Sequence, residues 1–500
     1  MEEKLKKLKL LLAEIANLKA ADEILGWDQL VNMPGGAAED RGEQIATLEK
    51  IIHAKATSDE IGKLLGELTA DIKQLDPDSD DACLIRVAKR DYDKQTKVPA
   101  EFVTEMARVS TVAQSVWEKA KAQSNFELFR PYLEKLVELR RQYADFFKPW
   151  DHVYDPLLDD FEPGMKTSEV QVIFNTLRSR QVELIKEISQ VKQVDRSFLF
   201  LDYPESGQLA FGEKVISKFG YDWNHGRQDK STHPFTTSFG LYDVRITTRF
   251  NTNYLPTAMF GTMHECGHAL YELGIDKKFN RSPLAEGASM AVHESQSRMW
   301  ENQIGRSKPF WNHFFPILQE IFPTQLGNVD VKTFYKGVNA VEPSLIRVEA
   351  DEATYNLHIM LRLELEIALM DGSLLAKDAP AAWNAKFKEY LGIVPPDDAK
   401  GILQDMHWSF GGFGYFPTYA LGNLVSAQLW EKLNKNIPNL EEQVEKAHFT
   451  EILGWLRKNL HVYGAKFEPQ ELVKKVTGSE ITSEPYIRYL ESKFKAIYNL

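Results

Sequence analysis

Cysteine is scarce in this sequence: only Cys83 and Cys266 occur among 500 residues. Two cysteines cannot form a framework of disulfide bonds, so small disulfide-rich secreted folds are excluded and a reducing, cytoplasmic location is expected. Long apolar runs are also missing, because no stretch approaches the roughly 20 apolar residues that a membrane span needs. The apolar N-terminal stretch is interrupted by Glu14, Lys19 and Asp22, which predicts an amphipathic helix rather than a signal peptide. We therefore expect no membrane association.

Basic charge is in deficit, since the formal net charge is -12. A protein that binds nucleic acid needs a basic face, so the charge argues against nucleic acid as a partner. The chain is 43% apolar and 26% charged, which excludes a disordered composition and is typical of a globular enzyme.

Strand patterns are rare. The clearest one covers residues 235–250, FTTSFGLYDVRITTRF, which is rich in β-branched and aromatic residues and has Gly240 near a possible turn. This pattern predicts a β-hairpin.

Helical periodicity dominates the rest of the chain, with apolar residues at positions i, i+3, i+4 and i+7. The predicted helices cover residues 1–31, 38–75, 80–122, 125–149, 167–192, 255–273, 287–303, 352–369, 419–435 and 482–497. No internal repeat, low-complexity segment or long linker interrupts them. We expect a mainly α fold in one domain, residues 1–500, organised either as one body or as two lobes that flank a central groove.

The run His264-Glu265-Cys266-Gly267-His268 has the pattern H-E-x-x-H within a predicted helix. Positions i and i+4 lie on one face of a helix, so His264 and His268 can bind one metal ion. Glu265 is rotated by about 100° from His264 and can face the open side of the metal. Cys266 falls on the opposite face, where we expect it to pack in the core. The alternative is a surface helix with two unrelated histidines.

A catalytic zinc ion has three protein ligands and one open position. Glu294, in the predicted helix 287–303, follows His268 by 26 residues, which is enough for a loop and an antiparallel return. We expect Glu294 to be the third ligand. The side chain of the adjacent His293 then points elsewhere, either to support the site from behind or as an ordinary buried histidine.

Further stretches carry a family resemblance. They read, in order, Gly26-Trp27-Asp28-Gln29, Met33-Pro34-Gly35-Gly36, His233-Pro234-Phe235, Asp243-Val244-Arg245-Ile246-Thr247, His293-Glu294-Ser295-Gln296, Ile346-Arg347-Val348-Glu349-Ala350-Asp351 and Gly401-Ile402-Leu403-Gln404-Asp405-Met406-His407-Trp408. Together with the H-E-x-x-H run, they resemble the thermostable metallocarboxypeptidases of the carboxypeptidase Taq family over essentially the whole chain.

The resemblance implies a mainly α, deep-grooved zinc peptidase with a small β-hairpin or sheet near the active site. It also implies a homodimer that removes single residues with broad specificity from peptides with a free C-terminus. Each chain would bind one Zn²⁺ ion, which cobalt (Co²⁺) can replace.

The expected reaction is hydrolysis of the last peptide bond by a zinc-bound water. Glu265 would take the proton from that water and later deliver it to the leaving amine. The developing oxyanion needs a second stabilising group besides the metal. Tyr419 is the first candidate because it begins a predicted helix, and Tyr415 is the second. The alternative is that both tyrosines are core aromatics.

A carboxypeptidase must also recognise a free carboxylate, which the planar fork of an arginine does best. Arg347 is the favoured candidate and Arg245 the other. The alternative is that both form structural salt bridges, Arg245 with Asp243 and Arg347 with Asp351.

Three further residues are candidates near the groove. His233 and His407 are expected to line it and donate hydrogen bonds to substrate. Asp405 is expected to orient a histidine from behind.

Two other functions remain open at this point. An endo-acting oligopeptidase or dipeptidase would use the same zinc site and differ only in its carboxylate-binding residues. A non-catalytic peptide-binding protein on the same scaffold is opposed by the intact His264, Glu265, His268 and Glu294.

Overall fold

The computed structural model describes residues 1–500 as a mainly helical protein with one small sheet, which confirms the predicted fold class. The helices of the first half are α1 (Glu2–Val31), α2 (Ala38–Ala56), α3 (Asp59–Asp71), α4 (Asp80–Lys97), α5 (Ala100–Ala122), α6 (Phe126–Asp145), α7 (Asp155–Asp159), α8 (Thr167–Ser189), α9 (Glu205–Phe219) and α10 (Pro256–Gly274). Those of the second half are α11 (Met290–Arg298), α12 (Lys308–Ile321), α13 (Pro323–Leu326), α14 (Val331–Val338), α15 (Tyr355–Asp371), α16 (Ala379–Leu391), α17 (Pro417–Asn436), α18 (Leu440–Glu445), α19 (Thr450–Asn459), α20 (Pro469–Thr477) and α21 (Glu484–Tyr498).

In the structure, two of the long predicted helices are each divided into two separate helices. The stretch 38–75 breaks after Ala56, where the Ser58 hydroxyl accepts a hydrogen bond from the backbone N–H of Ile61 and caps α3. The stretch 80–122 breaks before α5, at Pro99. Proline has no N–H group to donate and is tolerated only where a helix begins. The apolar period therefore continues past Pro99 although the helix itself ends before it.

The sheet has the strand order β1-β3-β2, with β1 (Gln228–Lys230) parallel to β3 (Val244–Thr248) and β2 (Thr236–Ser238) antiparallel to it. The predicted hairpin is therefore confirmed as β2–β3, with Gly240 at a positive φ of 120° in its turn. Strand β1 was not predicted, since Gln228-Asp229-Lys230 has no apolar alternation.

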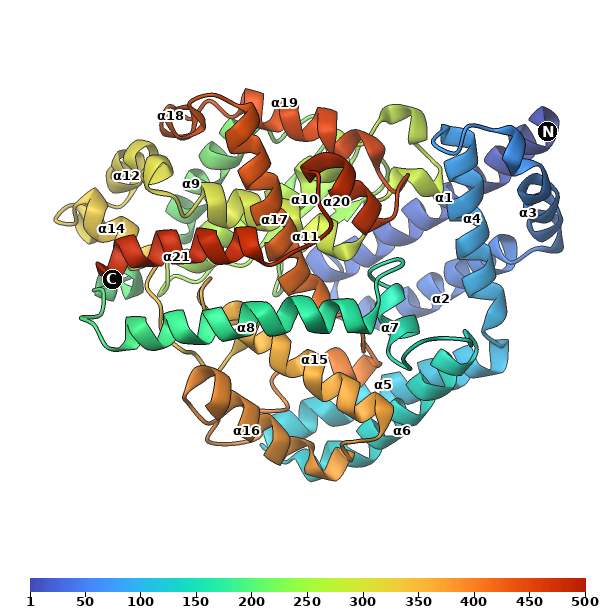
Figure 1. The fold of residues 1–500 in the computed structure, drawn as a ribbon, viewed down its shortest axis with the longest axis horizontal. Helices are drawn as coiled ribbons and strands as arrows, with labels where there is room; N and C mark the ends of the chain where they lie inside the picture. Colours follow the sequence, from blue (N-terminus) through green and yellow to red (C-terminus); the bar gives the residue numbers. More distant parts are fainter.

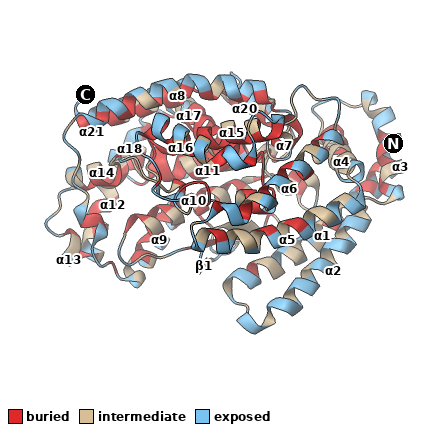
Figure 2. Cartoon of the chain, turned by 90° about the horizontal axis from the view of Figure 1, so that it is seen from below, coloured by how far each residue is buried: buried red, intermediate tan, exposed pale blue.

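The core is divided unequally. One apolar cluster of 103 buried residues runs through α5 to α21, and a second of 15 residues joins α1, α3 and α4 to the segment around Leu284. Helix α2 has no buried residue, and Figure 2 shows it as an exposed helix beside α1 at one end of the molecule. None of the helices combines the length and the apolar character that crossing a bilayer requires.

Helices α10, α11 and α17 lie in the middle of the molecule, above α8 in this view, with α1 to α4 on one side and α15 and α16 below (Figure 1). Both α10 and α17 begin with a proline in the first turn. Helices α10 and α11, which carry the predicted metal ligands, thus lie within the larger core.

Candidate metal centre

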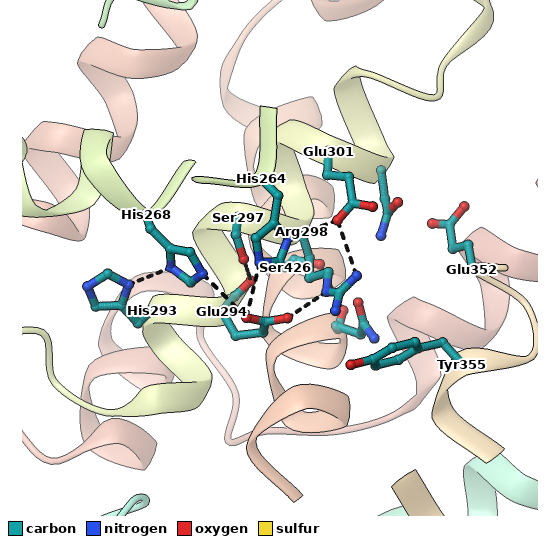
Figure 3. Close-up of polar contacts among 12 residues, drawn as sticks. His264, His268, His293, Glu294, Ser297, Arg298, Glu301, Glu352, Tyr355 and Ser426 are labelled. Atoms are coloured by element: carbon teal, nitrogen blue, oxygen red, sulfur yellow. Dashed lines mark hydrogen bonds and ion pairs between the residues drawn. The ribbon is translucent and has the colours of Figure 1, made fainter. Parts of the chain in front are cut away.

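Helices α10 and α11 bring three predicted metal ligands together (Figure 3). One ligand atom from each of His264, His268 and Glu294 lies within 4.8 Å of the others. Glu294 Oε2 is 3.7 Å from His264 Nε2 and 3.5 Å from His268 Nε2. Ligands about 2.1 Å from a tetrahedral ion lie roughly 3.4 Å apart. Two imidazoles and one carboxylate at these separations therefore fit one divalent cation.

Outer partners fix the orientation of both imidazoles. His264 Nδ1 lies 2.9 Å from Glu301 Oε2, and His268 Nδ1 lies 2.6 Å from His293 Nδ1. The other ring nitrogen of His293 is 2.6 Å from Glu272 Oε1. These contacts occupy the Nδ1 atoms and leave both Nε2 atoms free to bind a cation.

Glu294 is held as a carboxylate. Its Oε1 accepts a hydrogen bond from Arg298 Nε at 2.6 Å, so Oε2 alone faces the histidines. Burial would raise the pKa of Glu294, but the Arg298 guanidinium and the imidazole of His264 hold it well below its ordinary value. The ligand therefore needs no deprotonation to bind a metal.

The two histidines differ in their charge preference. Burial lowers the pKa of His268 to about 3, which keeps its imidazole neutral. Burial would lower the pKa of His264 as well, but the carboxylates of Glu294 and Glu301 raise it overall. The same carboxylates that favour a proton on His264 favour a divalent cation between the rings.

Glu265 is buried beside the ligands and faces strand β2. The hydroxyl of Thr236 lies 2.7 Å from Glu265 Oε2 and 2.9 Å from the backbone oxygen of the same residue. Burial raises the pKa of the Glu265 carboxyl, and the charge of His264 and the Thr236 hydrogen bond oppose this shift. One carboxylate oxygen thus stays free of protein donors next to the metal ligands.

Glycines permit the close approach of the helices. A Cβ atom on Gly267 of α10 would lie 2.6 Å from Ser297 Cα in α11, and one on Gly422 of α17 would lie 2.6 Å from Glu294 Cβ and Cγ. No side chain fits at either place. The distance between the His264–His268 pair and Glu294 therefore depends on these two glycines.

Tyr415 and Tyr419 lie near this centre, at the start of α17. Their ring centroids are 5.3 Å apart. Burial first, and the nearby Glu294 carboxylate among other charges, raise the pKa of both phenols. Both hydroxyls are therefore neutral donors at ordinary pH.

Arg347 and Asp405 form a buried pair. Arg347 donates from Nε and Nη2 to Asp405 Oδ1, at 3.0 and 2.8 Å, and from Nη1 to the Tyr355 hydroxyl. The partner of Arg347 is thus Asp405, so the alternative pair with Asp351 does not form. Asp405 also accepts hydrogen bonds from Arg362, so this carboxylate lies between two guanidiniums and contacts no histidine by a hydrogen bond.

The remaining candidates, Arg245, His407 and His233, come from three different segments of the chain. Arg245 donates to both oxygens of Asp243 and stacks between the rings of Trp27 and Phe239, so it joins α1 to the hairpin. The ring of His407 packs against Phe416 at a tilt of 38°, and burial followed by the charge of Arg347 lowers the pKa of His407 to about 3. His233 is exposed in the loop between β1 and β2.

Four residues of this centre were not predicted from sequence: Thr236, Glu272, Arg298 and Glu301. Arg298 and Glu301 follow Glu294 by four and seven residues, a spacing that would place all three on one face of a helix. That spacing was a usable signal. Thr236 and Glu272 carried none, because their roles depend on where β2 and His293 lie in space.

A buried carboxylate supports α11 from the loop before α8. Glu162 is fully buried, and its Oε1 accepts a hydrogen bond from the backbone N–H of Ala291 at 2.5 Å, while Oε2 has no partner. Burial raises the pKa of Glu162 to about 8, and the nearby Ser289 hydroxyl and the N–H of Ala291 only partly oppose this.

We predict that Glu162→Gln removes a pH-dependent loss of stability. The pKa is about 8 in the folded chain and near 4.5 when unfolded, so the folded state binds more protons between these values. The free energy of unfolding of the wild type then falls as pH rises through this window, by up to about 1.4 kcal/mol per pH unit. Thermal melts of both proteins between about pH 5 and pH 9 measure the difference. Parallel pH profiles would contradict the prediction.

The fold and this centre define a class: a mainly helical metallopeptidase whose candidate metal ligands come from an H-E-x-x-H helix and a following helix. Comparison with known proteins gives the particular family. The model of the carboxypeptidase Taq (M32) metallopeptidase family matches residues 7–494. The chain belongs to this family and is a metallocarboxypeptidase, as the sequence resemblance indicated.

Relatives match over nearly the full length. The chain is 40% identical over 495 residues to thermostable carboxypeptidase 1 of Thermus thermophilus, covering 97% of each chain, and 38% identical to carboxypeptidase 1 of Bacillus subtilis, covering 98% of each. The crystal structure of the M32 carboxypeptidase from Deinococcus radiodurans superposes with a TM-score of 0.97, at 39% identity and 100% coverage of both chains.

Proposed function

We propose that this metallocarboxypeptidase releases amino acids one at a time from free peptide C-termini, with broad specificity, and that its metal is one Zn²⁺ ion held by His264, His268 and Glu294. The convergence of His264 Nε2, His268 Nε2 and Glu294 Oε2 beside the buried Glu265 carboxylate carries this proposal. Two imidazoles and a carboxylate suit zinc, and cobalt, which prefers similar ligands, is expected to substitute.

Zinc in this position would polarise the scissile carbonyl and make a water acidic near neutral pH. Glu265 is proposed to accept the proton of the attacking water and pass it to the leaving amine. Thr236 donates to Oε2 and to the backbone oxygen of Glu265, which orients the carboxylate and leaves Oε1 to move the proton. The burial that raises the pKa of Glu265 strengthens it as a base.

The remaining roles rest on proximity. Tyr419 is proposed to donate to the developing oxyanion, with Tyr415 as the second candidate, because both phenols lie near Glu294. Arg347 is favoured over Arg245 for the substrate carboxylate. A guanidinium has five N–H groups, and the three that Arg347 uses for Asp405 and Tyr355 leave two for a ligand.

Other residues are proposed to support the reaction indirectly. His407 and His233 would line the groove and donate to substrate, His293 would orient His268, and Asp405 would position Arg347. We also propose that the chain acts as a single domain in the cytoplasm, as its lack of linkers and its two cysteines indicate, and that it forms a homodimer, as the resemblance implies.

Metal analysis combined with a peptide time course tests this function. We expect one zinc per chain and stepwise loss of C-terminal residues, with activity lost after chelation and regained with Zn²⁺ or Co²⁺. A C-terminally amidated peptide should be cut far more slowly than the free acid. Equal rates on both peptides would instead support an endo-acting oligopeptidase, and absence of turnover would support a binding protein.

A further inference from the structure

A large cavity lies between the N-terminal helices and residues that contact the metal centre, although no candidate metal ligand lines it. It has a volume of about 990 Å³ and lies between α1 and α2 on one side and the β2–β3 hairpin, the end of α10 and residues 280–286 on the other. The catalytic residues themselves do not explain a space of this volume, which falls within the range of ligand-binding sites.

Two contacts connect this cavity to the catalytic centre. Thr236 lines the cavity and holds Glu265 by its hydroxyl. Glu272 also lines the cavity and contacts His293, which contacts the ligand His268. Thr236 and Glu272 therefore lie at the boundary between the cavity and the catalytic centre.

The lining of the cavity is acidic. It carries the carboxylates of Asp22, Glu23, Glu49, Asp243, Glu272 and Glu286, against the cations of Lys19 and Arg281. Six carboxylates against two cations leave an excess of four acidic groups in the lining, which favours positively charged ligands.

Several of these carboxylates have no cationic partner in the chain. Asp243 is paired with Arg245, Glu272 contacts His293, and Lys19 Nζ lies 3.8 Å from Glu286. By contrast, no ion pair involves Asp22, Glu23 or Glu49. The Oδ1 atom of Asp22 is buried and accepts no hydrogen bond. Glu23 receives only the hydroxyl of Thr237, at 3.3 Å. These groups are available to a ligand that brings positive charge.

The charge of the cavity also decides which end of a peptide enters it. A free C-terminal carboxylate would be repelled by the six carboxylates, and Arg347, the favoured residue for binding that carboxylate, does not line the cavity. The segment upstream of the scissile bond is therefore the part that the cavity accommodates.

We propose that this acidic cavity binds the upstream part of the substrate and selects peptides that carry positive charge there, as lysine or arginine side chains or as the free N-terminal ammonium. Glu23 and Glu49 are the proposed specificity-determining residues, one on each N-terminal helix. The proposal rests on the proposed function for the direction of the peptide.

The test uses three peptides with the same two C-terminal residues and with two lysines, two alanines or two glutamates upstream. We expect kcat/KM for the lysine peptide to exceed that for the glutamate peptide by about tenfold at low salt, as several partly screened ion pairs would give. The ratio should fall towards one in about 0.5 M salt. It should also fall in the double variant Glu23→Gln, Glu49→Gln.

A matched control removes two charges elsewhere. Glu183 and Glu187 are exposed on α8 and form no ion pair, so Glu183→Gln, Glu187→Gln should keep the tenfold preference. A wild type that cuts the glutamate peptide as fast as the lysine peptide would overturn the proposal. A preference that survives in the Glu23, Glu49 double variant would overturn the assignment to these residues.

Binding separates this proposal from the proposed function. The affinities of the same three peptides for the Glu265→Gln variant can be measured by calorimetry. If the wild type does not shorten the alanine peptide, but the variant binds the lysine peptide about tenfold more tightly than the glutamate peptide, the carboxypeptidase mechanism fails and the cavity proposal stands. If the wild type shortens the alanine peptide and the variant binds all three peptides with equal affinity, only the cavity proposal fails.

Discussion

Replacing Glu265 with glutamine is expected to lower kcat about 10³-fold or more while the metal content stays at the wild-type level. General acid–base catalysis by one positioned group contributes about 10²- to 10⁴-fold, and the amide of glutamine cannot accept the proton. The fold should be unaffected, because the oxygen of the glutamine amide can still accept the hydrogen bond that Thr236 now donates to Glu265.

Turnover of a free-acid peptide and metal content of the purified protein measure this prediction together. The control is Glu301→Gln, which removes the carboxylate beside His264 Nδ1. That change should lower metal affinity by about 10- to 100-fold and leave the general base in place. Turnover that survives Glu265→Gln at full metal content would refute the role of Glu265.

Replacing Gly267 with alanine is expected to cost several kcal/mol of stability and most of the metal affinity. The added Cβ would lie 2.6 Å from Ser297 Cα, 2.7 Å from the backbone oxygen of Gln296 and 2.9 Å from Ser297 N. All three are backbone atoms of α11, so no side chain can turn aside to relieve the clash. Overpacking of this kind typically costs about 1–3 kcal/mol or more.

The loss of metal affinity follows from the geometry. Gly267 lies next to His268 on α10, and Ser297 lies one turn after Glu294 on α11, so separating the helices moves the ligands apart. Thermal melts and zinc titrations measure the two effects.

The matched control is Gly261→Ala on the same helix. An added Cβ there meets nothing within 4 Å, so alanine should leave metal binding unchanged and stabilise the helix by up to about 1 kcal/mol. Equal metal affinity in the Gly267 and Gly261 variants would show that the helix spacing does not control the site.

Much of the fold was predictable because it depends on local pattern. The helices around residues 255–273 and 482–497 were confirmed to within about two residues as α10 and α21. The hairpin in 235–250 was confirmed because β-branched residues flank a glycine turn. The breaks at Ser58 and Pro99 were missed because the apolar period continues through them, although a capping serine and a proline both mark helix ends.

The candidate site divides in the same way. The spacing of His264 and His268 indicated a pair of metal ligands, since positions i and i+4 lie on one face of a helix. Glu294 was expected as the third ligand because the 26 residues after His268 are enough for a loop and an antiparallel helix. The pair formed by Arg347 and Asp405 and the stacking of Arg245 on Trp27 were not predictable, because their partners are 58 and 218 residues away in the chain. Long-range contacts leave no periodic signal.

The sequence by itself thus determined the helical class, the metal-binding motif and the family, because these depend on residue type and on spacings within one or two turns. Only the tertiary structure decided which groups hold His264 and His268 from behind, which carboxylate oxygen is free, and that an acidic cavity adjoins the centre. Those features arise where α1, β2, α10 and α11 meet. Packing of elements that are distant in sequence sets such distances, and no local pattern encodes them.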